Sequence, residues 1–236
     1  MPRVSRLLAL AALAPLAAAA EPWSGELAAG YLATAGNSQT QSLNGKLALD
    51  YTTSLWKNAF LATAISSADN EGSTAERYTV GDKLDYNFSD RDYAFLALEW
   101  EKDLFGGIRE RTSQTVGYGR HVLTGPVHRL DLEAGAGARQ TEAGITGERD
   151  DDLIGRLFGK YSAQLSETSS FVQTLKLETG DTNTFTESVS ELKASILGNL
   201  AAALSYTVRH NSDVPAGTEK TDTFTAVNLS YAFGKK

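Results

Sequence analysis

The chain has 236 residues, with 22 Lys and Arg against 29 Asp and Glu, a formal net charge of −7 and no Cys. Without cysteine it has no disulfide framework, no thiolate metal site and no cysteine nucleophile. Its acidic balance does not supply the basic face that phosphate binding needs, so nucleic acid is excluded as a partner.

The first twenty residues differ in composition from the rest. Two arginines precede an apolar run, Leu7 to Leu16, and alanines fill positions 17–20. A basic start, a short apolar core and small residues before the cut are typical of a secretory signal peptide, and the run is short for a membrane span of about 20 residues. We predict cleavage after Ala20, giving a mature chain 21–236 with a net charge of −7 − 2 = −9, because the segment holds two Arg and no acid.

The mature chain then alternates between apolar and polar residues. Along 40–53, the odd-numbered positions include Leu43, Leu47 and Leu49, and the even-numbered positions include Lys46 and Asp50. Strict alternation predicts a strand with one apolar face and one polar face. The same pattern recurs along 130–139, 153–165 and 222–233. These strands are longer than the usual strand of about 5 or 6 residues in a soluble protein.

The connections between alternating segments are short and long in turn. Short polar or glycine-containing links lie at 54–56, 89–92, 124–127, 166–169 and 198–199, and each predicts a hairpin turn. Longer polar stretches lie between them, at 36–39, 69–76, 105–111, 141–151, 180–184 and 211–220. The predicted strands start near Trp23, Thr40, Lys57, Arg77, Tyr93, Thr112, His128, Asp152, Ser170, Thr184, Leu200 and Thr221.

This layout predicts an all-β fold, a transmembrane, antiparallel, up-and-down β-barrel of about 12 strands with both ends on the short-turn side. Because backbone groups in lipid must all pair, strands with an apolar outer face have to close without an edge. Segments such as 57–69 and 93–103 mix apolar residues on both parities, so 10 or 14 strands stay open. A soluble periplasmic β-sandwich is the structural alternative, although it favours short strands with a Val-, Ile- and Phe-rich core face.

Several segments resemble a known family. They are Gly30–Tyr31 with 34–38, Phe105–Arg111, 117–119, Glu133–Arg139, and Arg209–Gly217 with 220–223. In these segments the chain resembles the YdiY-like family of salt-induced outer-membrane proteins, from about Trp23 to Phe233. The resemblance implies a single barrel in the outer membrane, and the family has no known activity. The chain departs from the usual pattern in that three residues follow Phe233, whereas such proteins commonly end on the aromatic residue.

The side chains on the polar face of each strand, at every second position, are expected to line the lumen. Both signs of charge occur there, which argues against a strongly selective pore, because such a pore needs a ring of one sign. Paired charges that cross the lumen predict a structural barrel, whereas a gap along one wall predicts a small channel. The candidate lumen-lining residues are Lys46, Asp50, Lys83, Asp85, Asp131, Glu133, Arg139, Arg156, Lys160, Lys176, Glu178, Arg209 and Asp222.

Two other groups of residues have side-chain types that occur in catalytic or ion-binding sites. His210, Asn211 and Ser212 have the side-chain types of a hydrolytic triad, but successive strand residues face opposite sides, so a polar loop start is the better interpretation. The stretches Gly107–Arg111 and Thr146–Asp152 could bind a divalent cation or lipopolysaccharide phosphates, with Asp150 to Asp152 as oxygen ligands. The aspartates lack the spaced pattern of a calcium loop, so a solvated surface loop is the better interpretation. We predict no catalytic residue, no metal, no cofactor and no enzymatic activity.

The resulting prediction is a structural or stress-related protein of the cell outer membrane, where the salt-stress link comes from the family resemblance alone. The alternatives are a porin-like passive channel for small polar solutes or ions and, more distantly, a lipid-modifying barrel enzyme. The expected partners are outer-membrane lipid, lipopolysaccharide and the outer-membrane assembly machinery, with the oligomeric state left open. The candidates for aromatic girdles at the two membrane interfaces are Trp23, Trp56, Trp100, Tyr31, Tyr51, Tyr86, Tyr161 and Tyr231, with ordinary lipid-facing or lumen-filling positions as the alternative.

Overall fold

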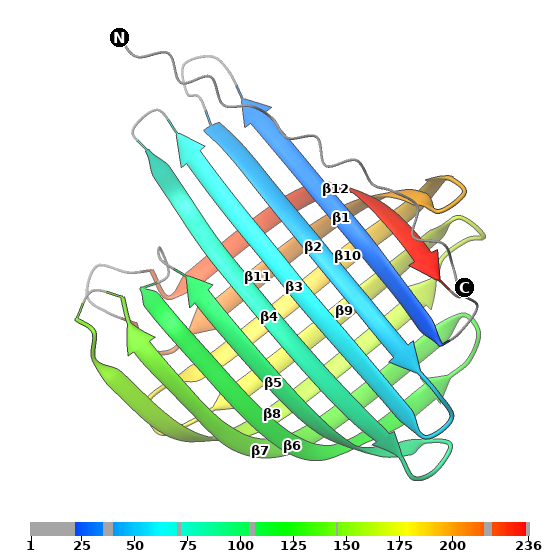
Figure 1. Ribbon diagram of the computed structural model, residues 1–236, viewed down its shortest axis with the longest axis horizontal. Helices are drawn as coiled ribbons and strands as arrows, with labels where there is room; N and C mark the ends of the chain where they lie inside the picture. The colour runs from blue at the N-terminus through cyan, green and yellow to red at the C-terminus, as the bar shows by residue number, and fades with distance from the viewer. Residues whose placement is uncertain are drawn as a thin grey trace.

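The computed structural model describes residues 22–34, 40–69, 72–103, 107–144, 146–214 and 219–234. These described residues form twelve antiparallel strands that close into one barrel (Figure 1). Each strand pairs with its neighbours in sequence, and β1 pairs with β12 to close the wall. The strands are β1 (Trp23–Thr34), β2 (Thr40–Thr52), β3 (Trp56–Asp69), β4 (Ser73–Asn87), β5 (Asp92–Asp103), β6 (Ile108–Thr124), β7 (His128–Ala143), β8 (Arg149–Gln164), β9 (Ser169–Thr179), β10 (Thr184–Leu197), β11 (Leu200–Asn211) and β12 (Thr221–Gly234).

The predicted barrel and its strand number are confirmed, and the differences lie at one set of strand ends. β4, β6 and β8 begin at Ser73, Ile108 and Arg149, several residues before the predicted starts. The predicted long loops at 69–76, 105–111 and 141–151 are shorter for this reason. Their polar residues continue the hairpin ladders, because backbone hydrogen bonds hold a strand together whether its side chains are polar or apolar.

The two ends of the barrel differ in their connections. We call the end with residues 53–55, 88–91, 125–127, 165–168 and 198–199 the turn side, and the opposite end, with 180–183 and 212–220, the loop side. The tightest turn is Gly198–Asn199, where Gly198 has a φ of 57°. Glycine at the first central position is what a two-residue hairpin turn favours. β1 starts and β12 ends on the turn side, as the sequence predicted. The predicted signal peptide (1–20) and the predicted loop 36–39 lie outside the described residues.

The outer face of the wall is apolar. Leu153, Leu157, Val116 and Val227 lie on it with exposed fractions of 82%, 56%, 59% and 65%. The part of the chain that the structure describes has no helix long and apolar enough to cross a bilayer. A continuous belt of exposed apolar side chains this extensive marks a surface that contacts something other than water. The outer face therefore matches the surface that lipid requires.

Aromatic residues border this belt on the turn side. Trp23 contacts Tyr51 with ring centroids 4.9 Å apart, and Trp56 contacts Tyr86 at 4.8 Å. Each pair joins neighbouring strands at directly opposed positions. All eight predicted girdle residues fall on outward positions of the ladder, with Tyr31 and Trp100 toward the loop side.

The strands with mixed parity place apolar residues inside the barrel. Tyr93, Phe95 and Ala97 of β5 form a buried cluster on the inner face. Glycines on β6 make room for it, because a Cβ on Gly119 would lie 2.2 Å from the Tyr93 ring and one on Gly117 would lie 2.7 Å from Phe95. Apolar residues on both faces thus obscure the alternation of this strand without changing its pairing.

Candidate functional site: the lumen and its ion pairs

The register places all thirteen candidate lumen-lining residues on one face of the wall. Residues that are opposed in an antiparallel ladder share a face, so Lys46, which pairs with Thr63, fixes the inward parity of β2 and β3. The same chain of pairings runs around the barrel, for example from Arg139 to Asp152 and from Arg209 to Asp222. That this face is the inner one follows from ion pairs that join strands which are not neighbours, since such pairs must cross the lumen.

Arg209 of β11 is the centre of the largest group of crossing ion pairs. Its guanidinium lies 2.5 Å from Glu101 and 3.2 Å from Asp103, both on β5, and 3.0 Å from Glu187 on β10. Arg209 is 2% exposed and Glu101 is 8% exposed. A buried charge is tolerated only when it is paired, so this contact between β11 and β5 is a fixed structural link across the barrel.

Two more arginines join the same carboxylates. Arg77 of β4 lies 3.3 Å from Glu101 and 3.4 Å from Glu187, and Arg111 of β6 lies 3.8 Å from Glu101. Arg77 also stacks over the Phe224 ring of β12 at 5.5 Å. We call this group the loop-side network. Its members are Arg77, Glu101, Asp103, Arg111, Glu187 and Arg209.

The inner aromatic residue at the centre of this network is Phe185 of β10, which is 2% exposed. The cationic groups of Arg111, Arg209 and Lys176 lie 5.3, 4.9 and 5.3 Å from the centroid of its ring. A ring face attracts cations through its quadrupole, more strongly when water is excluded. Phe185 therefore keeps three cations close together that would otherwise repel one another.

A second link crosses at mid-height between β5, β8 and β9. Arg156 lies 3.1 Å from Glu99 and also donates to the Thr115 hydroxyl at 3.3 Å. Lys176 binds the other oxygen of Glu99. A single carboxylate of β5 thus holds two cations from the opposite wall.

A third group lies on the side of the barrel that includes the β1–β12 closure. Lys46 of β2 lies 3.4 Å from Glu26 of β1 and 3.2 Å from Glu191 of β10. Lys193 of β10 binds Glu26 as well. These pairs join β10 to β1 and β2, which are separated from it in the wall by β11 and β12, so they also pass through the lumen.

The turn-side half of the lumen is wetter. Its buried part is a cluster in which Glu133 accepts hydrogen bonds from Lys83 and from the Tyr93 hydroxyl, the latter at 2.9 Å. Lys160 is exposed, and it forms no hydrogen bond or ion pair within the described residues. Leu61, which also faces inward, is 42% exposed. Water therefore reaches this half of the inner wall.

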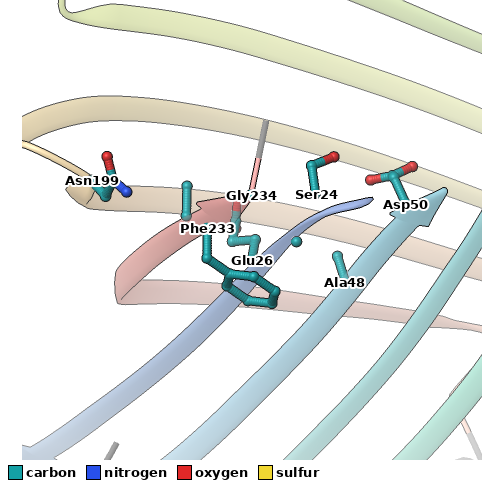
Figure 2. Close-up of a pocket in the computed structure, with 9 residues that line it drawn as sticks. Ser24, Glu26, Ala48, Asp50, Asn199, Phe233 and Gly234 are labelled. Atoms are coloured by element: carbon teal, nitrogen blue, oxygen red, sulfur yellow. The ribbon is translucent and has the colours of Figure 1, made fainter. Parts of the chain in front are cut away.

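A cavity of about 190 Å³ lies at the turn-side rim, beside the β1–β12 closure (Figure 2). Figure 2 shows Ser24 and Asp50 pointing to one side of the wall and the Phe233 ring to the other. Glu26, which binds Lys46 and Lys193, also lines it. The cavity is thus a shallow extension of the turn-side lumen.

Sequence reasoning missed several members of the ion pairs. Glu99, Glu101 and Asp103 follow the apolar Tyr93, Phe95 and Ala97 on the same parity. The apolar residues hid the inward face of β5, although three acids at every second position were a readable signal. The other inward charges not singled out include Glu26, Lys57, Arg77, Arg111, Arg129, Glu187, Glu191 and Lys193.

The alternative sites do not assemble in the described structure. His210 faces outward and contacts Thr221 at 2.9 Å, whereas Asn211 is buried and accepts from Arg111. Of the three aspartates at 150–152, Asp152 faces inward and binds Arg139 at 3.0 Å. No group of three His, Asp or Glu residues within the described ranges could hold a metal ion.

A closed antiparallel barrel with an apolar outer face and a charged inner face defines a transmembrane β-barrel protein. The chain matches the family described as "Protein of unknown function, DUF481" over residues 27–233, and it belongs to that family. It is 34% identical over 222 residues to "Uncharacterized protein YdiY" of Escherichia coli (strain K12), over 92% of this chain and 85% of that protein. The resemblance seen in the sequence is confirmed.

Two solved structures show the same fold. The NanC porin has a TM-score of 0.52 at 11% identity, over 90% of this chain and 100% of that chain. The COG4313 outer membrane channel from Pseudomonas putida F1 also has a TM-score of 0.52, at 13% identity, over 91% of this chain and 96% of that chain. At these identities the similarity concerns the fold alone.

Proposed function

We propose that this protein is an outer-membrane barrel whose lumen is closed to solutes and whose role in the envelope is structural. The observation that carries the proposal is the loop-side network, in which Arg209 binds acids of β5 and β10 while it is 2% exposed. Side chains that are buried and paired across a barrel leave no water-filled path between them. The link to salt stress stays an expectation from the family resemblance.

The apolar belt and the girdle aromatics support a place in the outer membrane. The N-terminal segment with its basic start and apolar core supports export through a cleaved signal peptide. The proposed partners are therefore outer-membrane lipid, lipopolysaccharide and the assembly machinery that inserts such barrels. No enzymatic role is part of the proposal.

Single-channel recording of the refolded chain 21–236 in a planar bilayer tests the closed lumen. Heat-modifiable gel migration first establishes that the barrel is folded. The unmodified barrel is expected to give no discrete current steps. The triple variant Arg209→Ser, Asp103→Ser and Glu187→Ser removes a cation together with two of its partners and is expected to open a conducting path.

The matched control removes an ion pair from the outer surface. Arg109 lies 3.1 Å from Glu142, and its side chain is 57% exposed. The double variant Arg109→Ser and Glu142→Ser should leave the barrel silent. Salt-proportional steps from the unmodified barrel would overturn the proposal.

A passive channel for small polar solutes is the second candidate. The exposure of Lys160 and Leu61 on the inner face favours it, because it leaves part of the turn-side inner wall accessible to water. The same recording separates the two functions. If the unmodified barrel conducts, Lys160→Glu should shift the preference of the current toward cations.

A further inference from the structure

The loop that joins β9 to β10, residues 180–183, bends over the loop-side mouth of the lumen. The carbonyl oxygen of Asn183 accepts a hydrogen bond from Arg139 at 2.6 Å. Arg139 is on β7, and β8 and β9 lie between β7 and β10 in the wall. Because Arg139 faces inward and is 2% exposed, the loop reaches it from inside the rim and not over the outer face.

Asn183 also joins the loop to the other flank of the mouth. Its side-chain amide donates to Asn211 of β11 at 2.9 Å, and Asn211 is buried on the inner face. Its side-chain oxygen accepts from the Ser212 hydroxyl and from the backbone N–H of Asp213, both at 3.1 Å. Asn211 in turn accepts from Arg111 of β6 at 3.3 Å. One uncharged residue therefore connects the loop to two parts of the wall and, through Asn211, to the loop-side network.

A second set of contacts joins the loop to Asp152 of β8. The Thr182 hydroxyl donates to one oxygen of this carboxylate, and the Thr182 backbone N–H donates to the other at 3.3 Å. Gly180 lies against the same group, since a Cβ at this position would be 2.9 Å from Asp152 Oδ2. Glycine permits this close approach of the backbone. Asp152 faces inward and is 7% exposed, so the loop lies over it.

The contacts of the loop can be released without leaving a charge unpaired. Thr182 and Asn183 are uncharged, and Arg139 and Asp152, to which they bond, are also paired with each other at 3.0 Å. Water can replace hydrogen bonds of this kind when the loop lifts. The loop-side network, in contrast, cannot open without separating buried ion pairs. Loop 180–183 is therefore an element that can open locally while the barrel stays closed.

We propose that loop 180–183 is a lid on the loop-side mouth of the lumen, held shut by Asn183 and Thr182, which keeps water from the inner wall beneath it. The proposal deepens the closed lumen of the proposed function, on which it rests, by naming a second barrier above the loop-side network. Opening the lid admits water and small reagents as far as the network and not through the barrel.

Thiol labelling of the folded, otherwise cysteine-free barrel 21–236 tests the lid. The reporter is Ile154→Cys, because Ile154 is 3% exposed and lies on β8 one inward position below Asp152. A small water-soluble methanethiosulfonate reagent labels it at a rate that follows the fraction of time for which the lid is open. Asn183→Ala should speed labelling about tenfold, because the side-chain hydrogen bonds that hold the lid are lost. Thr182→Val should speed it as well, by a smaller factor.

Two matched controls separate the lid from a general loosening of the barrel. Asp181→Ala changes an exposed side chain of the same loop that forms no hydrogen bond or ion pair within the described residues, so the labelling rate should not change. Ser162→Cys is a turn-side reporter on the inner face of the same strand, and Asn183→Ala should leave its labelling rate unchanged. Glu178→Cys, on β9 at a position 2% exposed, serves as a second loop-side reporter if Ile154→Cys does not fold.

An unchanged labelling rate at the loop-side reporter in Asn183→Ala would overturn the proposal. So would labelling of Ile154→Cys as fast as that of Ser162→Cys with the loop intact, because the mouth would then be uncovered. Single-channel recording of Asn183→Ala should stay silent, since the loop-side network remains. Current from the unmodified barrel would instead contradict the closed lumen, so the two failures give different results.

Discussion

The two halves of the lumen carry the same kinds of side chain in different states. On the loop side, Arg209 and Glu101 are buried and bonded across the barrel. On the turn side, Lys160 has the same inward parity and is exposed, with no bonded partner among the described residues. The difference shows that an inward charge does not by itself open or close a barrel. What differs is whether the opposite charge is within bonding distance, since Asp131, directly opposed to Lys160, contacts His121 instead.

The largest effect is expected from removing the central cation of the loop-side network. Arg209→Ala removes the cation that the buried carboxylates of Glu101 and Asp103 share with the half-buried carboxylate of Glu187. The free energy of unfolding should fall by about 3–5 kcal/mol, because removing one partner of a buried ion pair is strongly destabilising. Urea titration of the folded barrel, followed by gel migration, measures the loss. Arg109→Ala, on the exposed outer pair, should cost at most about 1 kcal/mol.

A smaller loss is expected in the buried part of the turn-side half. Tyr93→Phe removes the hydroxyl that donates to Glu133 at 2.9 Å. A hydrogen bond to a charged group contributes about 1.5–3 kcal/mol, and the urea midpoint should fall accordingly. The control Tyr86→Phe alters a hydroxyl on the exposed outer face. Equal midpoints for the two variants would contradict the assignment of Tyr93 to a buried bond.

The glycines beside the inner aromatic cluster give the third test. Gly117→Ala places a Cβ 2.3 Å from the Ala134 carbonyl oxygen and 2.7 Å from Phe95. Overpacking of this kind costs about 1–3 kcal/mol. Gly45→Ala is the matched control, because no atom lies within 4 Å of the added Cβ. If both substitutions leave the urea midpoint unchanged, the result contradicts the close contact of Gly117 with Phe95 and the Ala134 carbonyl oxygen.

The smallest effect is expected at Lys160. Because its charge has no bonded partner in the described structure, Lys160→Ala should change the free energy of unfolding by no more than about 0.5 kcal/mol. The result sharpens the contrast with Arg209, since both residues are inward cations. A loss as large as that of Arg209→Ala would show that Lys160 is itself held in a paired network.

Much of the fold could be predicted from local pattern. Alternation along β2, β7, β8 and β12 gave their faces correctly, because a strand repeats every two residues whatever it packs against. The predicted ends of β4, β6 and β8 were wrong on the loop side, because polarity does not reveal where a hairpin ladder stops. β5 was obscured by Tyr93 and Phe95, which face inward onto glycines of another strand.

The sequence by itself thus determined the class of the protein, the order of its strands and the face of the charges on the strands that alternate regularly. Only the tertiary structure decided which charges meet, because Arg209 and Asp103 are on strands far apart in the chain and face each other only after closure. It alone also showed how far the paired register of β1 and β12 extends, from Ser24 opposite Gly234 to Ala29 opposite Leu229. Periodicity is a property of one strand, whereas ion pairs across a lumen are a property of strands that the closure brings together.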